Sequence, residues 1–199
     1  MNDLTIAAFD KFAEQYVDLT FLNVLQYELN RFISMIPKKG KIIDLGCGSG
    51  RDVQYFMDYG FDAVGVDGSE NMITEAKKRV PDGDFKVMHL QSLNFPEQSF
   101  DAGWALDSIS YIKKEEVPNF LLSLYKILKN DAVVFISARH GEGEKEIEFG
   151  KLGNSRIPIA FFSQEELETL LTENGFEVIN SFVQDGEDFT WVNVYAKKK

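Results

Sequence analysis

The stretch Lys41–Arg51 constrains the fold of this chain more than any other part of its sequence. It reads Lys-Ile-Ile-Asp-Leu-Gly-Cys-Gly-Ser-Gly-Arg, so a short apolar run carries Asp44 and continues into three alternating glycines. A helical pattern begins directly afterwards. A buried strand, a glycine turn and a helix form the first half of a nucleotide-binding βαβ unit, and glycine tolerates the positive φ angles of such a turn. We therefore predict an α/β fold.

The glycine spacing also discriminates between ligands. The dinucleotide fingerprint has glycines at its first, third and sixth positions, but the sixth residue counted from Gly46 is Arg51. A large side chain there opposes the close helix–strand packing of that fingerprint. Asp44 would repel a pyrophosphate and favour a cationic ligand instead. A nicotinamide-dependent oxidoreductase is therefore the less favoured enzyme class.

The rest of the chain predicts the element order βαβαβ, then βαβ, then αββ. The last two strands have no helix between them and should form an antiparallel hairpin. We expect one domain over residues 1–199, with a doubly wound, Rossmann-like, mostly parallel seven-stranded sheet and helices on both faces. The predicted strands are 41–45, 61–66, 84–89, 101–107, 131–138, 176–183 and 190–197, and the predicted helices are 1–19, 20–36, 52–59, 70–79, 114–129 and 164–174.

Two further features match one enzyme family. Asp67 follows Gly46 by 21 residues and ends the second predicted strand, where an acid suits the hydroxyls of a ribose. The segment 93–101 reads Leu-Asn-Phe-Pro-Glu-Gln-Ser-Phe-Asp. Together with Asp-Leu-Gly-Cys-Gly-Ser-Gly and the terminal hairpin, these features resemble the class I S-adenosylmethionine (SAM)-dependent methyltransferases over about residues 5–197.

The resemblance implies SAM as cofactor and S-adenosylhomocysteine (SAH) as product. It implies methyl transfer to a small-molecule acceptor by in-line displacement, in which the protein mainly positions and shields the reactants. His89 takes the place of an acid that family members often bring to adenine, so either His89 or Gln91 is expected to accept from the adenine amino group. The residues that the resemblance assigns to SAM are Tyr16, Asp44, Gly46, Cys47, Gly48, Gly50, Asp67, Gly68, His89, Leu90, Gln91 and Ala105.

The acceptor is expected at the carboxyl ends of the fourth and fifth predicted strands. His140 is a candidate base because its ordinary pKa of about 6.5 suits proton transfer near neutrality, and Asp107 is a second candidate catalytic group. Tyr111, Arg139 and Arg156 are candidate substrate-binding residues. The two arginines either hold a carboxylate or phosphate of the acceptor or pair with the acids of segment 142–148.

Two segments are expected to cover the site. Residues 1–36 should form helices over the cofactor and acceptor. Residues 139–162 are first polar and glycine-rich and then apolar, and a loop of this length inside a compact domain is usually functional, so we expect a lid.

The composition excludes several other classes. A net charge of −11 opposes a nucleic acid footprint, and no Asn-Pro-Pro-aromatic motif follows the fourth predicted strand, where Leu106–Ile109 stands. Cys47 is the only cysteine, so no intrachain disulfide forms, and we assign no residue to a metal. The N-terminus has no signal pattern and no apolar run approaches 18 residues, so we expect a cytoplasmic protein without membrane contact, as a monomer or homodimer. A protein acceptor and a non-catalytic SAM-binding regulator stay open as alternatives.

Overall fold

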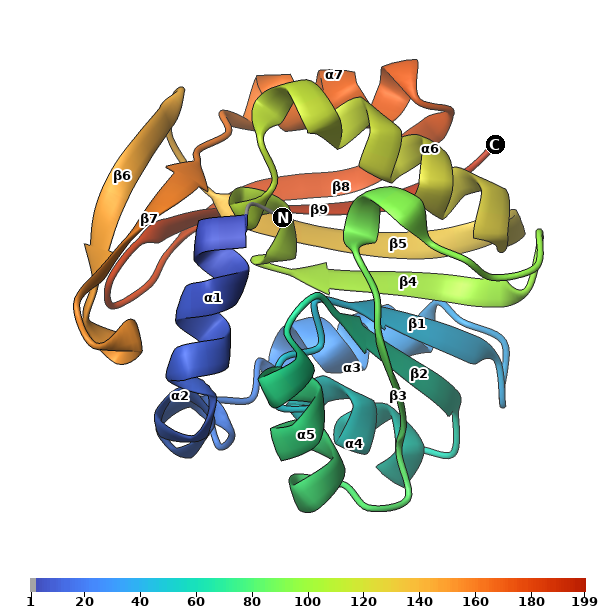
Figure 1. Cartoon of the computed structure of the whole chain (residues 1–199). Coiled ribbons are helices and arrows are strands. Elements are labelled where there is room, and N and C mark those ends of the chain that lie inside the picture. Colours follow the sequence, from blue (N-terminus) through green and yellow to red (C-terminus); the bar gives the residue numbers. More distant parts are fainter. Residues whose placement is uncertain (1–2) are drawn as a thin grey trace.

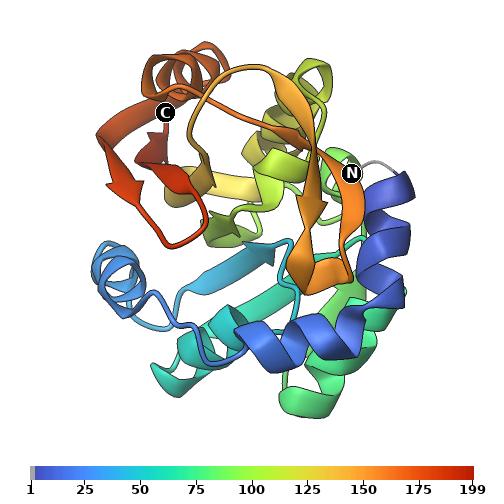
Figure 2. The ribbon, with the colours of Figure 1, turned by 90° about the vertical axis from the view of Figure 1, so that its left-hand side faces the viewer.

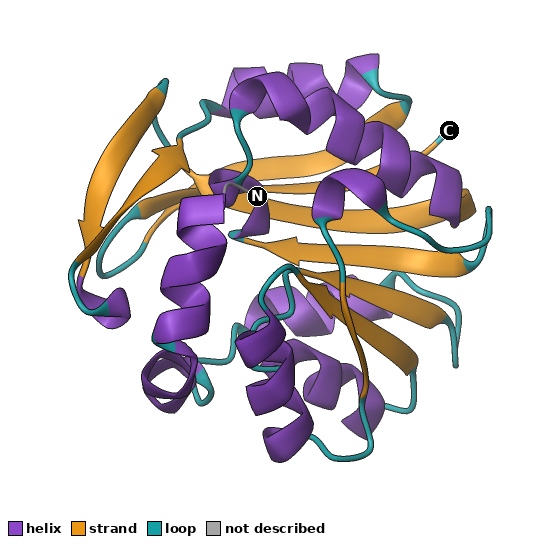
Figure 3. Cartoon of the chain, viewed as in Figure 1, coloured by secondary structure: helices purple, strands orange, loops and turns teal. Residues whose placement is uncertain are grey.

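A seven-stranded sheet forms the centre of the protein in the computed structural model, which describes residues 3–199 (Figures 1 and 3). The strand order is β3-β2-β1-β4-β5-β9-β8, in which β1 to β5 are parallel and β9 runs antiparallel to both β5 and β8. The strands are β1 (Lys41–Leu45), β2 (Asp62–Asp67), β3 (Asp84–Val87), β4 (Phe100–Leu106), β5 (Leu128–Arg139), β8 (Phe176–Asp185) and β9 (Thr190–Lys198). The predicted mostly parallel sheet with a C-terminal antiparallel hairpin is confirmed.

Helices cover both faces of this sheet, as a parallel sheet requires. On one face, α6 and α7 pack against β4, β5 and β9, and on the other, α3, α4 and α5 pack against β1, β2 and β4 (Figure 1). The helices are α1 (Asp3–Lys11), α2 (Ala13–Thr20), α3 (Gln26–Ser34), α4 (Arg51–Asp58), α5 (Glu70–Arg79), α6 (Val117–Ile127) and α7 (Gln164–Glu173), and four short 3₁₀ turns are η1 (Leu90–Ser92), η2 (Ser108–Tyr111), η3 (Lys114–Glu116) and η4 (Gly150–Leu152).

The N-terminal region differs from its prediction in where the helices break. Instead of two helices over 1–19 and 20–36, the chain forms α1 and α2 with a break at Phe12, and α3 begins only at Gln26. The predicted helix 114–129 likewise starts as the 3₁₀ turn η3 and ends at Ile127, because β5 already begins at Leu128. Packing against neighbouring elements decided these boundaries, while helical periodicity alone indicated only which residues share a face.

Segment 139–162 is not the predicted loop. After β5 it forms a two-stranded antiparallel hairpin of β6 (Glu144–Phe149) and β7 (Ser155–Ala160), joined through η4. On β6 the glutamates alternate with Lys145, Ile147 and Phe149, so one face of this strand is exposed, and on β7 Ile157 and Ile159 are fully buried. This hairpin packs with α1 and α2 into a third hydrophobic cluster, beside the end of the main sheet (Figure 2).

Among residues 3–199, the structure contains no helix that is both long and apolar enough to cross a bilayer. Within the same residues, no cluster of three or more His, Cys, Asp or Glu side chains is arranged to hold a metal ion.

Candidate functional site

The turn between β1 and α4 needs its glycines for two reasons. Gly46, Gly48 and Gly50 have φ angles of 76°, 50° and 76°, a region that side chains disfavour. In addition, a Cβ atom on Gly46 would lie 2.5 Å from the Cβ atom of Ser108, so a side chain cannot fit. The Gly46 and Cys47 N–H groups donate to the carbonyl of Val66 at 2.8 and 3.0 Å, which ties the turn to the end of β2.

Asp67 joins the turn to the next βα connection. One carboxylate oxygen accepts from the Gly48 N–H at 3.0 Å and the other accepts from the Ser69 N–H at 2.9 Å. Burial raises the pKa of Asp67, and these backbone donors oppose that rise. Helix α1 is anchored to the same place, because Asp10 accepts from the Ser69 hydroxyl at 2.5 Å and from the Asn71 N–H at 3.0 Å.

Asp44 is a buried carboxylate without a hydrogen-bond or ion-pair partner among the described residues. Only 3% of the residue is exposed, and it lies on the same sheet face as Trp104, its register partner on β4. Burial raises the pKa of Asp44 well above its ordinary value, and the nearby charge of Asp52 raises it further, while Arg51 acts in the opposite direction. An uncompensated buried carboxylate is costly, so this position favours a cation.

Arg51 and Asp52 form a buried ion pair next to Asp44. The Arg51 guanidinium donates to the two carboxylate oxygens of Asp52 at 2.7 and 2.9 Å, and one of those oxygens also accepts from the Trp104 indole N–H at 2.9 Å. Arg51 additionally donates to the Thr20 carbonyl at the end of α2 at 3.4 Å. The arginine that the glycine spacing singled out therefore links the turn to the N-terminal helices.

A second polar cluster lies where β4 and β5 end. Arg139 donates to the two Asp107 oxygens at 3.3 and 3.1 Å, and its Nη2 also donates to the Tyr111 hydroxyl at 2.8 Å. The Tyr111 hydroxyl in turn donates to Asp107 at 3.0 Å. Burial and the Asp107 charge raise the pKa of Tyr111 well above its ordinary value, so the phenol stays protonated. The Arg139 guanidinium lies 4.0 Å from the centroid of the Phe189 ring, and its Nη1 atom is buried without a partner.

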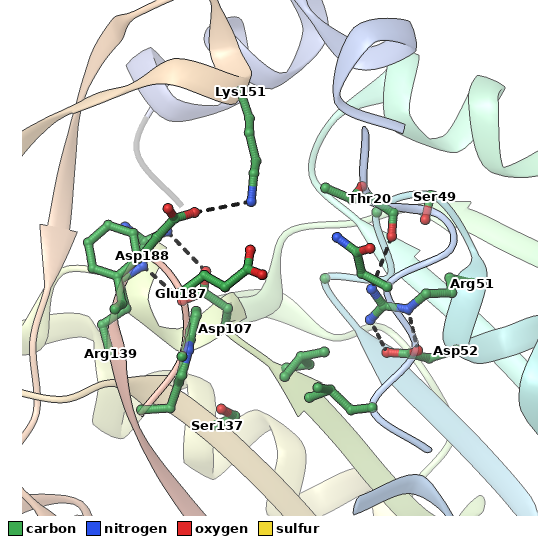
Figure 4. A pocket seen from close by; sticks show the side chains of 18 of the residues that line it. Thr20, Ser49, Arg51, Asp52, Asp107, Ser137, Arg139, Lys151, Glu187 and Asp188 are labelled. Atoms are coloured by element: carbon green, nitrogen blue, oxygen red, sulfur yellow. Dashed lines mark hydrogen bonds and ion pairs between the residues drawn. The ribbon is translucent and has the colours of Figure 1, made fainter. Parts of the chain in front are cut away.

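These groups face a cavity of about 430 Å³ (Figure 4). Its walls come from the glycine turn, the end of α2, the ends of β4, β5 and β9, the β6–β7 hairpin and the β8–β9 turn. An ion pair of 3.2 Å between Lys151 and Asp188 joins the last two. A smaller cavity of about 60 Å³ lies between Asp67 and the helices α1 and α2, with Tyr16 lining both cavities. Burial, followed by the Asp107 charge, raises the pKa of Tyr16 to about 12.

The structure brings about half of the predicted site residues to these two cavities. The predicted residues that line one cavity or both are Tyr16, Asp44, Gly46, Cys47, Gly48, Asp67, Asp107, Tyr111 and Arg139. Residues far apart in the sequence therefore meet beside the glycine turn, at the carboxyl ends of the parallel strands, where such sheets place their ligand sites.

Other predicted residues lie away from both cavities. Ala105 and Leu90 pack into the apolar cluster under α6. Ala105 faces this cluster because adjacent residues of a strand point to opposite sides, and on β4 it is Leu106 that reaches the cavity. The Gln91 amide donates to Glu116 at 2.9 Å. Gly50 packs against Phe85. His89 is exposed beside Gly68, outside the space that either cavity occupies.

His140 and Arg156 are also absent from the cavity lining. His140 follows Arg139 and therefore points to the other side of the strand, where it is exposed. Arg156 is exposed on β7 and lies opposite Glu148 in the hairpin register. The structure thus leaves Arg139 as the one predicted arginine at the cavity.

Sequence reasoning missed several residues that line the large cavity. They are Thr20, Arg51, Asp52, Ser137, Lys151, the turn Gln184–Phe189, Trp191 and Asn193. One signal was available: Ser137 and Asn193 are polar residues inside otherwise apolar strands. The turn carried no signal, because which loops meet at the site depends on strand order.

Comparison with known proteins gives consistent results. A family model described as a methyltransferase domain matches residues 19–181. The 2-methyl-6-phytyl-1,4-hydroquinone methyltransferase of Synechocystis is 22% identical over 162 residues, which are 78% of this chain and 47% of that protein. The chain spans about half the length of the curated relatives it matches.

Solved structures share the fold. A SAM-dependent methyltransferase from Methanosarcina mazei superposes with a TM-score of 0.77 at 20% identity, covering 84% of this chain and 96% of that one. The 1,6-didemethyltoxoflavin-N1-methyltransferase of Burkholderia thailandensis, solved with 1,6-didemethyltoxoflavin and SAH bound, superposes with a TM-score of 0.71 at 18% identity, covering 98% of this chain and 88% of that one.

Proposed function

Because the chain belongs to the SAM-dependent class I methyltransferase family, we propose that it transfers a methyl group from SAM to a small-molecule acceptor bound in the large cavity. The observation that carries this proposal is Asp44, a buried carboxylate that lines the cavity and has no partner of its own among the described residues. When bound, SAM supplies a methyl group that its sulfonium has already activated.

The residues around the glycine turn fit the amino acid end of this cofactor. Asp44 would accept from the ammonium group, which provides the positive charge that its position favours. Arg51 lies beside it and lines the same cavity, so its guanidinium would face the carboxylate of the same zwitterion. The absence of a side chain at Gly46 and Gly48 lets the ligand approach the backbone.

Asp67 and Tyr16 would hold the nucleoside end. Each Asp67 oxygen already accepts one backbone N–H and has a remaining lone pair for a ribose hydroxyl. Tyr16 lies between the two cavities and forms an edge-to-face contact with Phe9, with ring centroids 5.2 Å apart. It would cover the cofactor between its two ends.

Asp107 is the ionisable group best placed to act on an acceptor. It lines both cavities, and Arg139 and Tyr111 fix its carboxylate in one orientation. It would orient an acceptor hydroxyl or amine by accepting its hydrogen. The largest contribution to rate would come from bringing the reactants together in a site closed to water, which can lower a barrier by roughly 7–11 kcal/mol.

Thermal unfolding in the presence of SAM, SAH, NADH or NADPH tests this proposal. A ligand at a hundredfold excess over its Kd adds about 2.7 kcal/mol to the free energy of unfolding. For a chain of this length, the melting temperature should rise by about 5–11 °C with SAM and SAH only. A shift with a nicotinamide nucleotide alone, or with none of the four, would contradict the proposal.

A further inference from the structure

Three strands place a row of side chains across the deep wall of the large cavity. Leu106 on β4 is the register partner of Ser137 on β5, and Ser137 is the register partner of Asn193 on β9. In-register neighbours point to the same side of a sheet, and all three residues line the cavity. The row therefore crosses the sheet from β4 to β9, and each step leads further from the glycine turn that follows β1.

The next row of the same sheet face, behind the cavity wall, consists of aromatic side chains. Trp104 and Phe135 stack with ring centroids 4.2 Å apart, and Phe135 contacts Tyr195 at 4.8 Å. All three side chains are fully buried. These three rings do not line the cavity themselves. The aromatic side chains that do line it are Tyr16, Phe149, Phe189 and Trp191.

Ser137 and Asn193 are buried polar residues with unused hydrogen-bonding capacity. They are only 1% and 3% exposed. Among the described residues, the Ser137 hydroxyl has no hydrogen-bond partner, and the one contact of the Asn193 side chain is a long bond of 3.5 Å from its amide to Gln184. Polar groups in such enclosed places are nearly always hydrogen-bonded, so the free Ser137 hydroxyl and the carbonyl of the Asn193 amide, side by side on one cavity wall, point to a ligand.

The cations of the cavity are already neutralised. Arg51 is paired with Asp52, Arg139 with Asp107, and Lys151 with Asp188 (Figure 4). The free nitrogen of Arg139 is buried beneath aromatic rings, so it does not face the cavity space. The cavity is also lined by Asp44, Asp185 and Glu187, which leaves it with an excess of negative charge. An anionic acceptor would be repelled.

We propose that Ser137 and Asn193 form the acceptor-recognition subsite, and that they select a planar molecule without negative charge that carries a hydrogen-bond donor and acceptor on one edge. This inference rests on the proposed methyl transfer, since it assigns the part of the cavity that the cofactor leaves to the acceptor. Parallel and antiparallel neighbours are about 4.8 Å apart, so the subsite lies roughly 10–14 Å from Asp44 along the sheet. The amide or ring edge of the acceptor would pair with the hydroxyl and carboxamide, while its flat face would lie near the rings of Phe189 and Trp191, which line the same cavity.

Benzamide and benzoate test this proposal because they have the same shape and differ at one edge in charge and in hydrogen-bond donors. Their binding is measured by ligand-observed NMR titration, with and without saturating SAH. Wild-type protein should bind benzamide and bind benzoate at least tenfold more weakly. Ser137→Ala and Asn193→Ala should each weaken benzamide binding by about 2–12-fold, the effect of losing one neutral hydrogen bond. Ser34→Ala, at an exposed serine of α3, serves as the matched control.

SAH affinity, measured by calorimetry on the same proteins, separates the two proposals. Neither Ser137→Ala nor Asn193→Ala should change it by more than twofold, which also shows that the variants are folded. If wild-type protein fails to bind SAH, the proposed methyl transfer is wrong. If SAH binds but benzoate binds as well as benzamide, or neither probe binds up to about 10 mM, or both variants bind benzamide like wild type, the subsite assignment is wrong.

Discussion

Replacing Asp44 with asparagine should change stability and cofactor binding in opposite directions. The carboxylate is 3% exposed, lacks a partner among the described residues, and has a pKa raised chiefly by burial. Asparagine has nearly the same shape but no charge. Without cofactor, the variant should be more stable than wild type, because it no longer buries an unpaired charge. With cofactor, the variant should bind more weakly, because the ion pair with the ammonium group is lost.

The gain in stability depends on pH with a defined sign. An aspartate in the unfolded chain has a pKa of about 3.9, and the folded value of Asp44 is higher. The folded state therefore binds the proton more tightly, and the stability that this contributes is present below about pH 3.9 and is lost as the pH rises through the folded pKa. Asp44→Asn should match wild type near pH 4 and exceed it at pH 7.5. Each unit of the upward pKa shift corresponds to about 1.4 kcal/mol, or about 3–6 °C in Tm.

The loss in binding follows from the ammonium group of SAM or SAH. A hydrogen bond to a charged partner contributes about 1.5–3 kcal/mol, so Asp44→Asn should weaken SAH binding by about 13–160-fold. Wild-type affinity should also fall as the pH is lowered through the folded pKa of Asp44, because a proton must then leave before the ammonium binds. The variant should lack this pH dependence.

Calorimetric titration with SAH and thermal unfolding, both at several pH values, measure these effects. Asp82→Asn, at an exposed position after α5, is the matched control and should change neither quantity. The reasoning would be refuted if Asp44→Asn bound SAH within twofold of wild type. It would equally fail if the cofactor-free variant melted below wild type at pH 7.5.

Three further outcomes are expected. Asp67→Ala should weaken SAM binding by at least about tenfold in calorimetry, since a charged acceptor of ribose hydroxyls is lost, and unchanged affinity would remove the ribose assignment. Arg139→Met should lower the free energy of unfolding by at most about 3–5 kcal/mol in urea titrations, because the half-buried Asp107 loses its ion-pair partner and keeps only the hydrogen bond from Tyr111. The double variant with Asp107→Leu should recover part of that loss, and no recovery would show that the ion pair is not the cause. Hydrogen exchange around Lys151 and Asp188 should slow when SAH and an acceptor bind together, and an unchanged rate would argue against a lid.

Local patterns were sufficient to predict the scaffold and to single out Asp44, Asp67 and the glycine turn, which line the cavities. The glycine turn, Asp44 and Asp67 are set by short-range rules: a strand that ends, a backbone with positive φ, and a second strand one helix further along. Short apolar runs between turns likewise predicted all seven strands of the main sheet, although only packing decided where β5 begins and where α2 and α3 separate. Segment 139–162 forms a hairpin and not the predicted loop. Its glycines and charged residues are typical of a loop, whereas the glutamates at every second position of β6 form the exposed face of a strand.

The end of the cavity that we propose for the acceptor was decided by tertiary structure alone. Ser137 and Asn193 are 56 residues apart, and they meet only because β9 inserts between β5 and β8 in an antiparallel register. Strand order and register depend on the packing of whole faces, which a local pattern does not encode. The same register turned Arg139 towards Asp107 and left His140 exposed, two adjacent residues that look equally suited to chemistry in the sequence. The sequence motif therefore determined the conformation of the glycine turn and the carboxylates beside it, and the arrangement of the strands determined which side chains face the remaining cavity.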